Sequence, residues 1–171
     1  MDQPPDAVLF DRDGTLIKDV PYNGDPDRVE PMPGAHDVLR VLRANGVPTG
    51  VVSNQSGIGR GLLTRAQVDA VNARVEELLG PFGTWQVCPH GPDDGCACRK
   101  PAPAMIFAAC EALQARPERT FFIGDIEADV AAALAAGAVP ILVPTPQTLP
   151  DEVDRAPRTA PDLRSALAMV L

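Results

Sequence analysis

The sequence predicts an α/β protein with three layers, in which helices cover both faces of a doubly wound parallel β-sheet. Two observations carry this prediction. Apolar segments of strand length alternate with segments of helical periodicity along the chain, a pattern typical of parallel strands joined by right-handed crossovers. Polar residues directly follow the predicted strands, at the edge where ligands bind in such sheets. The chain of 171 residues fits one domain, residues 1–171.

The first half of the chain predicts three strands and two helices. Residues 7–11 form a short apolar run with a β-branched and an aromatic residue, which indicates a buried strand. A helix is predicted over 33–46, where proline stands near the start, glycine stands at the end and apolar residues recur at helical spacing. The apolar run 47–53 predicts the second strand. A threonine cap opens a helix over 64–80, and residues 85–90 predict the third strand.

The second half repeats the same alternation. Residues 103–115 predict a helix with its apolar side chains facing inward, and 120–125 predict a strand. A helix over 128–137 ends at a glycine, as helices commonly do. The apolar run 140–145 predicts the fifth strand, and a final helix is expected over 161–170.

Composition and charge exclude several classes of function. Hydrophobic residues make up 45% and charged residues 22% of the chain, as in ordinary soluble domains. The net charge of -8 argues against a nucleic acid or an anionic membrane as partner, because both bind clustered positive charge. No apolar run reaches the roughly 18 residues of a membrane helix, and "MDQPPDAV" lacks the features of a signal peptide. We expect a cytoplasmic monomer without disulfides.

Polar groups follow four of the predicted strands. Asp11 and Asp13 end the first, Ser53 and Asn54 end the second, and Asp125 ends the fourth. The third strand runs into "CPHGPDDGCACRKP". Each group alone is compatible with a polar turn, because Asp, Asn, Ser and Gly are common turn formers. Four such groups at one edge of one sheet indicate a binding site.

The spacing of the acidic residues points to a metal site. Asp11 and Asp13 are two positions apart, so an extended backbone would direct both carboxylates to one side and Arg12 to the other. Two carboxylates that close repel each other unless a cation lies between them or one holds a proton. Asp125 from another strand would complete an oxygen-rich site suited to Mg²⁺. Ser53 and Lys100 would supply a hydroxyl donor and a point charge for a phosphoryl group.

Four segments resemble, in order, the motifs of the haloacid dehalogenase superfamily of phosphotransferases: "DRDGT" the first, "VVSN" the second, Lys100 the third and "GDIEAD" the fourth. The resemblance covers nearly the whole chain. It implies a Rossmann-like core and Mg²⁺-dependent hydrolysis of a phosphomonoester through an aspartyl-phosphate. The segment between Thr15 and Pro33 is too short for a lid, so we expect no cap domain.

The resemblance also implies a role for each motif residue. Asp11 would attack phosphorus, and Asp13 would protonate the leaving oxygen and then activate water. Thr15 would help to position Asp13. Mg²⁺ would be held by Asp11, the backbone carbonyl of Asp13 and Asp125, with Asp129 as a supporting residue. Ser53 and Lys100 complete the expected catalytic set.

Four residues at the end of the third strand and in the segment after it predict a structural zinc site. Cys88, His90, Cys96 and Cys98 supply three thiolates and an imidazole, which suit tetrahedral Zn²⁺ and leave no open position for catalysis. The alternative is that they are unrelated residues of a polar loop. Cys110 lies on an apolar helix face and is expected to be a core residue.

The segments "SNQSGIGRG" and "CPH…CxCRKP" resemble the capless, zinc-containing branch of the superfamily that includes heptose 1,7-bisphosphate phosphatases and histidinol-phosphate phosphatases. The branch implies a small phosphorylated metabolite as partner. A substrate bisphosphate would favour added cations away from the reacting group, and Lys18, Arg60 and Arg99 are candidates. The branch implies these substrate-binding positions: Asp19, Val20, Pro21, Tyr22, Ser53, Asn54, Gln55, Ser56, Arg99 and Lys100. We add Arg60 to them as a candidate cation.

The substrate and two other classes of function stay open. We expect a sugar bisphosphate, with heptose 1,7-bisphosphate as the leading candidate, because the chain carries no appended dehydratase domain. Histidinol phosphate is the alternative, because the five residues between the two pairs of zinc ligands make a gap shorter than in many heptose phosphatases and closer to that of the histidinol-phosphate enzymes. A phosphate-accepting signalling domain would share the sheet and the acidic pocket, and a zinc-dependent binding module would share the cysteine cluster. Either would lack turnover through Asp11.

Overall fold

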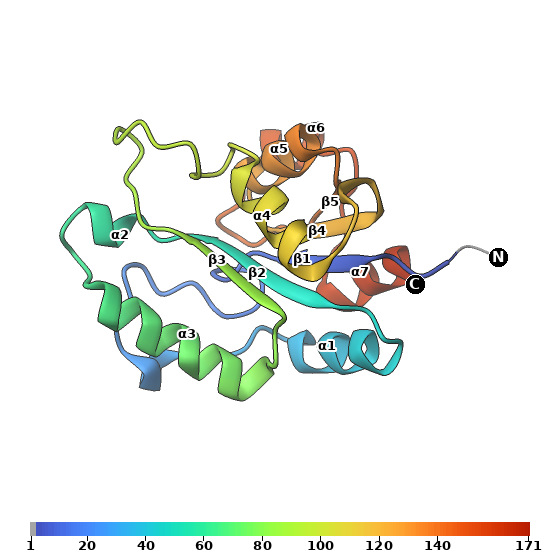
Figure 1. The fold of residues 1–171 in the computed structure, drawn as a ribbon, viewed down its shortest axis with the longest axis horizontal. Helices are drawn as coiled ribbons and strands as arrows, with labels where there is room; N and C mark the ends of the chain where they lie inside the picture. The colour runs from blue at the N-terminus through green and yellow to red at the C-terminus, as the bar shows by residue number, and fades with distance from the viewer. Residues whose placement is uncertain (1–2) are drawn as a thin grey trace.

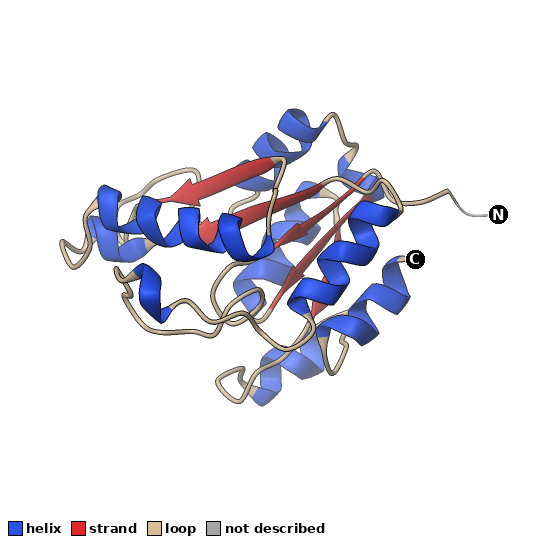
Figure 2. Cartoon of the chain, turned by 90° about the horizontal axis from the view of Figure 1, so that it is seen from below, coloured by secondary structure: helices blue, strands red, loops and turns tan. Residues whose placement is uncertain are grey.

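Five parallel strands form the central sheet of the computed structural model, which describes residues 3–171. Their order across the sheet is β3-β2-β1-β4-β5, so the direction of winding reverses at β1. Figure 2 shows the strands pointing toward the same edge of the sheet. The predicted doubly wound parallel sheet is confirmed. The strands are β1 (Ala7–Phe10), β2 (Thr49–Asn54), β3 (Thr84–Cys88), β4 (Thr120–Gly124) and β5 (Val139–Leu142).

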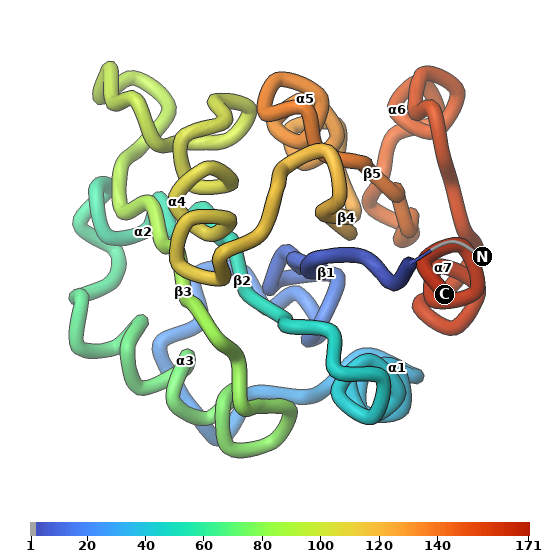
Figure 3. The backbone as a smooth tube through the Cα atoms, turned by 45° about the vertical axis from the view of Figure 1, so that its right-hand side comes forward, coloured from blue at the N-terminus to red at the C-terminus, as the bar shows by residue number. Residues whose placement is uncertain are grey.

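Helices cover both faces of this sheet. In Figures 1 and 3, α4 and α5 lie on one face, whereas α1, α3 and α7 lie on the other. No helix among residues 3–171 is long and apolar enough to cross a membrane. The helices are α1 (Ala35–Ala44), α2 (Ser56–Gly59), α3 (Arg65–Leu79), α4 (Ala104–Leu113), α5 (Glu127–Ala136), α6 (Pro150–Arg155) and α7 (Leu163–Val170), with 3₁₀ turns at Pro26–Arg28 and Pro117–Arg119.

The predicted elements are present, and their ends differ by a few residues. The third strand stops at Cys88 instead of residue 90, because Pro89 has no N–H to donate to a neighbouring strand. The fifth strand is also shorter than predicted and ends at Leu142. The sequence pattern does not predict α2 and α6, because helices of four and six residues are too short to show helical periodicity.

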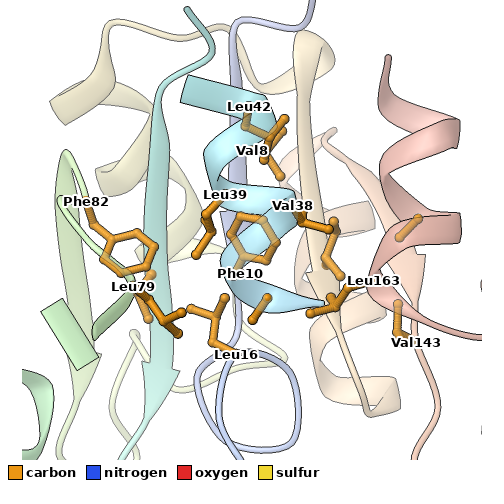
Figure 4. Close-up of a cluster of buried hydrophobic side chains, with 14 of the residues drawn as sticks. Val8, Phe10, Leu16, Val38, Leu39, Leu42, Leu79, Phe82, Val143 and Leu163 are labelled. Carbon is orange, nitrogen blue, oxygen red and sulfur yellow. The ribbon is translucent and has the colours of Figure 1, made fainter. Parts of the chain in front are cut away.

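The core consists of two clusters, one on each face of the sheet. Along β1, Val8 and Phe10 belong to one cluster and Leu9 belongs to the other, as the alternation of side chains in a strand requires. Figure 4 shows Phe10 facing Leu39 of α1. Because both faces are covered, the strands read as continuous apolar runs. Cys110 is buried in the second cluster, which confirms its prediction as a core residue.

The sheet register brings the polar strand ends together. Phe10 pairs with Ile123, and the N–H of Asp11 donates to the Ile123 carbonyl at 2.9 Å, which places the end of β1 beside the end of β4. On the other side of β1, Asn54 at the end of β2 pairs with Cys88 at the end of β3. Residues that follow these four strands therefore share one edge, at the reversal of strand order where ligands bind.

Candidate active site

Lys100 lies at the centre of the site and is buried. Its Nζ donates to Asp11 Oδ1 at 3.0 Å, to Asp129 Oδ1 at 2.7 Å and to the Val52 carbonyl at 2.9 Å. Burial opposes the charge on this ammonium group, but the two carboxylates outweigh it and hold the pKa of Lys100 above its usual range. The loop after β3 thus delivers a cation to the ends of β1 and β4.

Three carboxylates lie close together beside this cation, and two of them contact it. Oxygen atoms of Asp11, Asp125 and Asp129 lie within 4.8 Å of one another. Burial, followed by the charge of Asp129, raises the pKa of Asp11 to about 7. Burial, followed by the charges of Asp11 and Asp129, raises the pKa of Asp125 to about 9. A divalent cation would relieve this repulsion, and carboxylate oxygens are the ligands that Mg²⁺ prefers, so the donor set fits that ion.

Asp129 has a supporting position at the start of α5. Its Oδ2 accepts hydrogen bonds from the N–H groups of Asp125 and Ile126, at 3.1 and 3.3 Å. Its other oxygen accepts from Lys100. With both oxygens engaged, Asp129 fixes the backbone that carries Asp125 and the ammonium group that contacts Asp11.

Gly14 allows the turn after β1 to approach Asp125. Its φ is 79°, in the left-handed region that side chains disfavour, and a Cβ atom here would collide with the carboxylate of Asp125. The glycine of the first motif is therefore required by both backbone conformation and space.

Asp13 is held differently from the prediction. Arg12 Nε and Nη2 donate to its carboxylate at 3.1–3.2 Å, and Gln55 Nε2 donates to Asp13 Oδ2 at 2.8 Å. The prediction that Arg12 points to the opposite side was wrong. The chain turns after β1, with the Leu16 N–H donating to the Arg12 carbonyl, so the alternation of an extended strand ends at Phe10.

Thr15 makes no side-chain hydrogen bond to Asp13 in this structure. Its hydroxyl is buried and has no hydrogen-bond partner among residues 3–171. The buried hydroxyl of Ser53 instead accepts a hydrogen bond from Gln55 Nε2 at 2.8 Å. Gln55 therefore connects the second motif to Asp13.

Two adjacent cavities open at this edge of the sheet. The first, of about 190 Å³, is lined by Asp11, Asp125 and Lys100 among others. The second, of about 250 Å³, is mostly polar, and Asp13, Asp19 and Asn54 line both cavities. Four lining residues were not predicted from the sequence: Arg12, Asn23 and Gly57 in the second cavity, and Ile126 in the first. The predicted substrate-binding residues that line the second cavity are Asp19, Val20, Pro21, Tyr22, Asn54, Gln55 and Ser56.

The predicted cations for a second phosphate line neither cavity. Lys18 is exposed and pairs with Glu30 at 2.6 Å. Arg60 is exposed at the end of α2. Arg99 lines a separate cavity of about 380 Å³ on the cysteine loop, where its Nη1 donates to the His90 carbonyl at 3.3 Å.

The predicted zinc ligands converge. Cys88 Sγ lies 2.9 Å from Cys98 Sγ and 3.7 Å from Cys96 Sγ, and His90 Nδ1 lies 3.3–3.4 Å from Cys98 and Cys88. Sulfur ligands of a tetrahedral zinc are about 3.8 Å apart, given Zn–S bonds of about 2.3 Å. The Arg99 N–H also donates to Cys96 Sγ at 3.4 Å. Cys88, Cys96 and Cys98 are not joined in disulfides, so three thiols and the His90 imidazole are available as ligands. This set of donors fits a structural Zn²⁺.

The arrangement matches a known enzyme family. The family model of the haloacid dehalogenase-like hydrolases matches residues 22–137. The chain belongs to this family. The match begins after Asp11 and Asp13, so the first motif is assigned by its position in the site.

Relatives within the haloacid dehalogenase-like hydrolases cover most of the chain. The D-glycero-beta-D-manno-heptose-1,7-bisphosphate 7-phosphatase of Pseudomonas putida is 41% identical over 81% of this chain and 82% of its own length. The enzyme of the same name from Escherichia coli is 33% identical over 88% and 85%. A crystal structure of D,D-heptose 1,7-bisphosphate phosphatase from B. bronchiseptica, complexed with magnesium and phosphate, has a TM-score of 0.85 and 28% identity, and the alignment covers 95% of this chain and 97% of that one.

These similarities agree with the predicted branch of the family. The chain is a phosphatase with the α/β fold of the haloacid dehalogenase-like hydrolases, and its cysteine–histidine cluster fits the zinc-containing branch.

Proposed function

We propose that the chain is a Mg²⁺-dependent phosphatase that removes the 7-phosphate of D-glycero-D-manno-heptose 1,7-bisphosphate. The observation that carries this proposal is the polar second cavity, which shares Asp13 and Asp19 with the cavity that holds Asp11 and Lys100. The relatives named above act on this bisphosphate according to their names, and they align over most of the chain.

Asp11 is the nucleophile in this proposal. One of its carboxylate oxygens attacks phosphorus, so an oxygen–phosphorus bond forms and the bond from phosphorus to the sugar oxygen breaks. Asp13 donates its proton to the departing oxygen. Asp13 then takes a proton from water, which attacks the phosphorus of the aspartyl-phosphate, releases inorganic phosphate and restores Asp11. Lys100, next to Asp11, neutralises charge on the phosphoryl oxygens.

The residues of the acidic cluster would hold Mg²⁺. Asp11 and Asp125 would supply carboxylate oxygens, Asp13 its backbone carbonyl, and Asp129 would support the site from α5. When bound, the ion neutralises charge on the phosphoryl group and on the carboxylates. Zn²⁺ held by the cysteine loop would fix Arg99 and Lys100 next to the last ligand, Cys98.

The lining of the second cavity supports recognition of sugar hydroxyls. Asp13 and Asp19 contribute two carboxylates and Arg12 one guanidinium group, so the cavity disfavours a second anion. Carboxylates and side-chain amides pair well with hydroxyl groups. We therefore place the sugar in this cavity and assign its second phosphate to Arg99 on the zinc loop.

The test is Mg²⁺-dependent phosphate release from heptose 1,7-bisphosphate and from histidinol phosphate, compared as kcat/KM. A large preference for the bisphosphate is expected. A preference for histidinol phosphate would overturn the proposed substrate but keep the chemistry. An Asp11 that is phosphorylated without turnover on either compound would indicate a signalling domain and overturn the enzymatic proposal.

A further inference from the structure

Arg12 places a buried guanidinium group against the proposed acid/base. Its side chain is 3% exposed, whereas that of Asp13 is 28% exposed. Nε and Nη2 contact both oxygens of the Asp13 carboxylate, and Nη1 donates to Asn72 Oδ1 at 2.7 Å. Asn72 belongs to α3, so an element outside the strand ends fixes the far side of the guanidinium group.

These contacts define the orientation of the carboxylate. A guanidinium group is planar and rigid, so two donors on one carboxylate specify its plane as well as its position. From the other side, Gln55 Nε2 donates to Asp13 Oδ2 and is itself held by Ser53. Rotation of the Asp13 carboxylate would therefore break contacts with two separate parts of the chain.

A simpler explanation is that Arg12 only compensates the charge of its neighbour. Burying a guanidinium group costs desolvation that an exposed ion pair avoids, so charge balance alone does not account for its position. A role as the binding site of a substrate anion is also disfavoured, because two carboxylates line the same cavity. What the contacts specify is the geometry of Asp13.

We propose that Arg12, anchored by Asn72, is a positioning residue that orients the Asp13 carboxylate for proton transfer. The inference rests on the proposed function, in which Asp13 is the general acid and base. It assigns catalytic importance to the residue between the two aspartates and to a residue of α3.

The test uses two variants. Arg12→Lys keeps the positive charge and loses the planar pair of donors, and Asn72→Ala removes the side chain that holds the guanidinium group. Both should lower kcat on heptose 1,7-bisphosphate, by about tenfold or more for Arg12→Lys, whereas KM stays within about twofold. Arg74→Lys is the matched control, because Arg74 lies on α3 and pairs with Glu77 at the surface. If Arg12→Lys fails to fold, Asn72→Ala still tests the proposal, because Asn72 is partly exposed.

A double-mutant cycle separates positioning from a structural role. Arg12→Lys should cause little further loss of turnover in an Asp13→Asn background, because it acts through the Asp13 carboxylate. With p-nitrophenyl phosphate as a second substrate, Arg12→Lys should release one equivalent of nitrophenolate in a rapid burst, because this leaving group needs little protonation. The steady-state rate after the burst should fall, because hydrolysis of the aspartyl-phosphate still needs Asp13 as a base.

Three outcomes would overturn the inference: an unchanged kcat in folded Arg12→Lys, a change in KM alone, or a full additional loss in the Asp13→Asn background. If Asp13→Asn itself turns over normally, the assignment of Asp13 in the proposed function fails as well. These results distinguish an error about Arg12 from an error about Asp13.

Discussion

The side-chain amide of Asn54 pairs with both backbone polar groups of Lys100. Its Nδ2 donates to the Lys100 carbonyl at 3.1 Å, and its Oδ1 accepts from the Lys100 N–H at 3.0 Å. Because Asn54 is the last residue of β2, the rigid sheet holds the loop that carries the central cation. Asn54 of the second motif therefore positions the backbone of Lys100, the residue of the third motif.

Replacing Asn54 with alanine should lower kcat/KM by about 10- to 100-fold, because Lys100 would shift relative to Asp11. Steady-state kinetics on the preferred substrate would measure this loss. Asn45→Ala is the matched control, since Asn45 is exposed at the end of α1 and should leave kinetics unchanged. Wild-type kinetics in Asn54→Ala would show that the backbone pairing is dispensable.

Asp11→Asn should abolish turnover and leave zinc bound, because the nucleophile and the cysteine cluster are separate groups. Phosphate release and metal analysis on the same preparation would check both halves. Retained turnover would reject Asp11 as the nucleophile. Loss of zinc along with activity would indicate that the substitution damages the fold.

Gly14→Ala should disrupt the acidic cluster more than a matched substitution elsewhere. Gly14 and Gly46 both have positive φ, so alanine costs about 1–2 kcal/mol of backbone strain at either position. Only at Gly14 would the new Cβ also meet the Asp125 carboxylate. Thermal melting and Mg²⁺ titration of activity would separate the two effects. Equal Mg²⁺ dependence in both variants would contradict this account of the turn.

Cys98→Ser should lower the melting temperature and raise KM together, because loss of zinc releases the loop that carries Arg99 and Lys100. Zinc content should fall from one equivalent per chain, as expected for one four-ligand site. Cys110→Ala is the control, since that thiol lies in the core, and zinc content should be kept. Normal melting and normal KM in zinc-free Cys98→Ser would rule out the structural role.

Stability should depend on pH differently with and without Mg²⁺. In the metal-free protein, burial raises the pKa of Asp11 to about 7 and of Asp125 to about 9, above the usual 3.8. The folded state then holds more protons than the unfolded state, so the free energy of unfolding falls as pH rises from about 4 to about 9.

Mg²⁺ favours the ionised carboxylates, so the melting temperatures with and without Mg²⁺ should diverge between pH 5 and pH 9. Calorimetry at constant zinc would measure this difference. Asp125→Asn is the comparison variant, and it should weaken the pH dependence. A constant difference across this range would contradict the role of these carboxylates.

Much of the site could be predicted because its signals are local in the sequence. Two patterns can be read from the sequence without the fold. One is an apolar strand that runs into Asp11 and Asp13, and the other is a set of thiols and an imidazole at the spacing of metal ligands. Which of the candidates Lys18, Arg60 and Arg99 meets a second phosphate could not be predicted in this way. The reach of a long side chain depends on the loop that carries it, and only Arg99 lies on the cysteine loop next to Lys100.

The sequence by itself determined the alternation of strands and helices, the edge of the sheet that bears the chemistry, and the cysteine–histidine cluster. These features follow from hydrophobic period and covalent spacing. Only the tertiary structure decided that Asn54 holds Lys100, that Arg12 turns back to Asp13, and that the Thr15 hydroxyl makes no hydrogen bond to Asp13. These contacts depend on sheet register and on turns after the strands, where the period of an extended chain no longer applies.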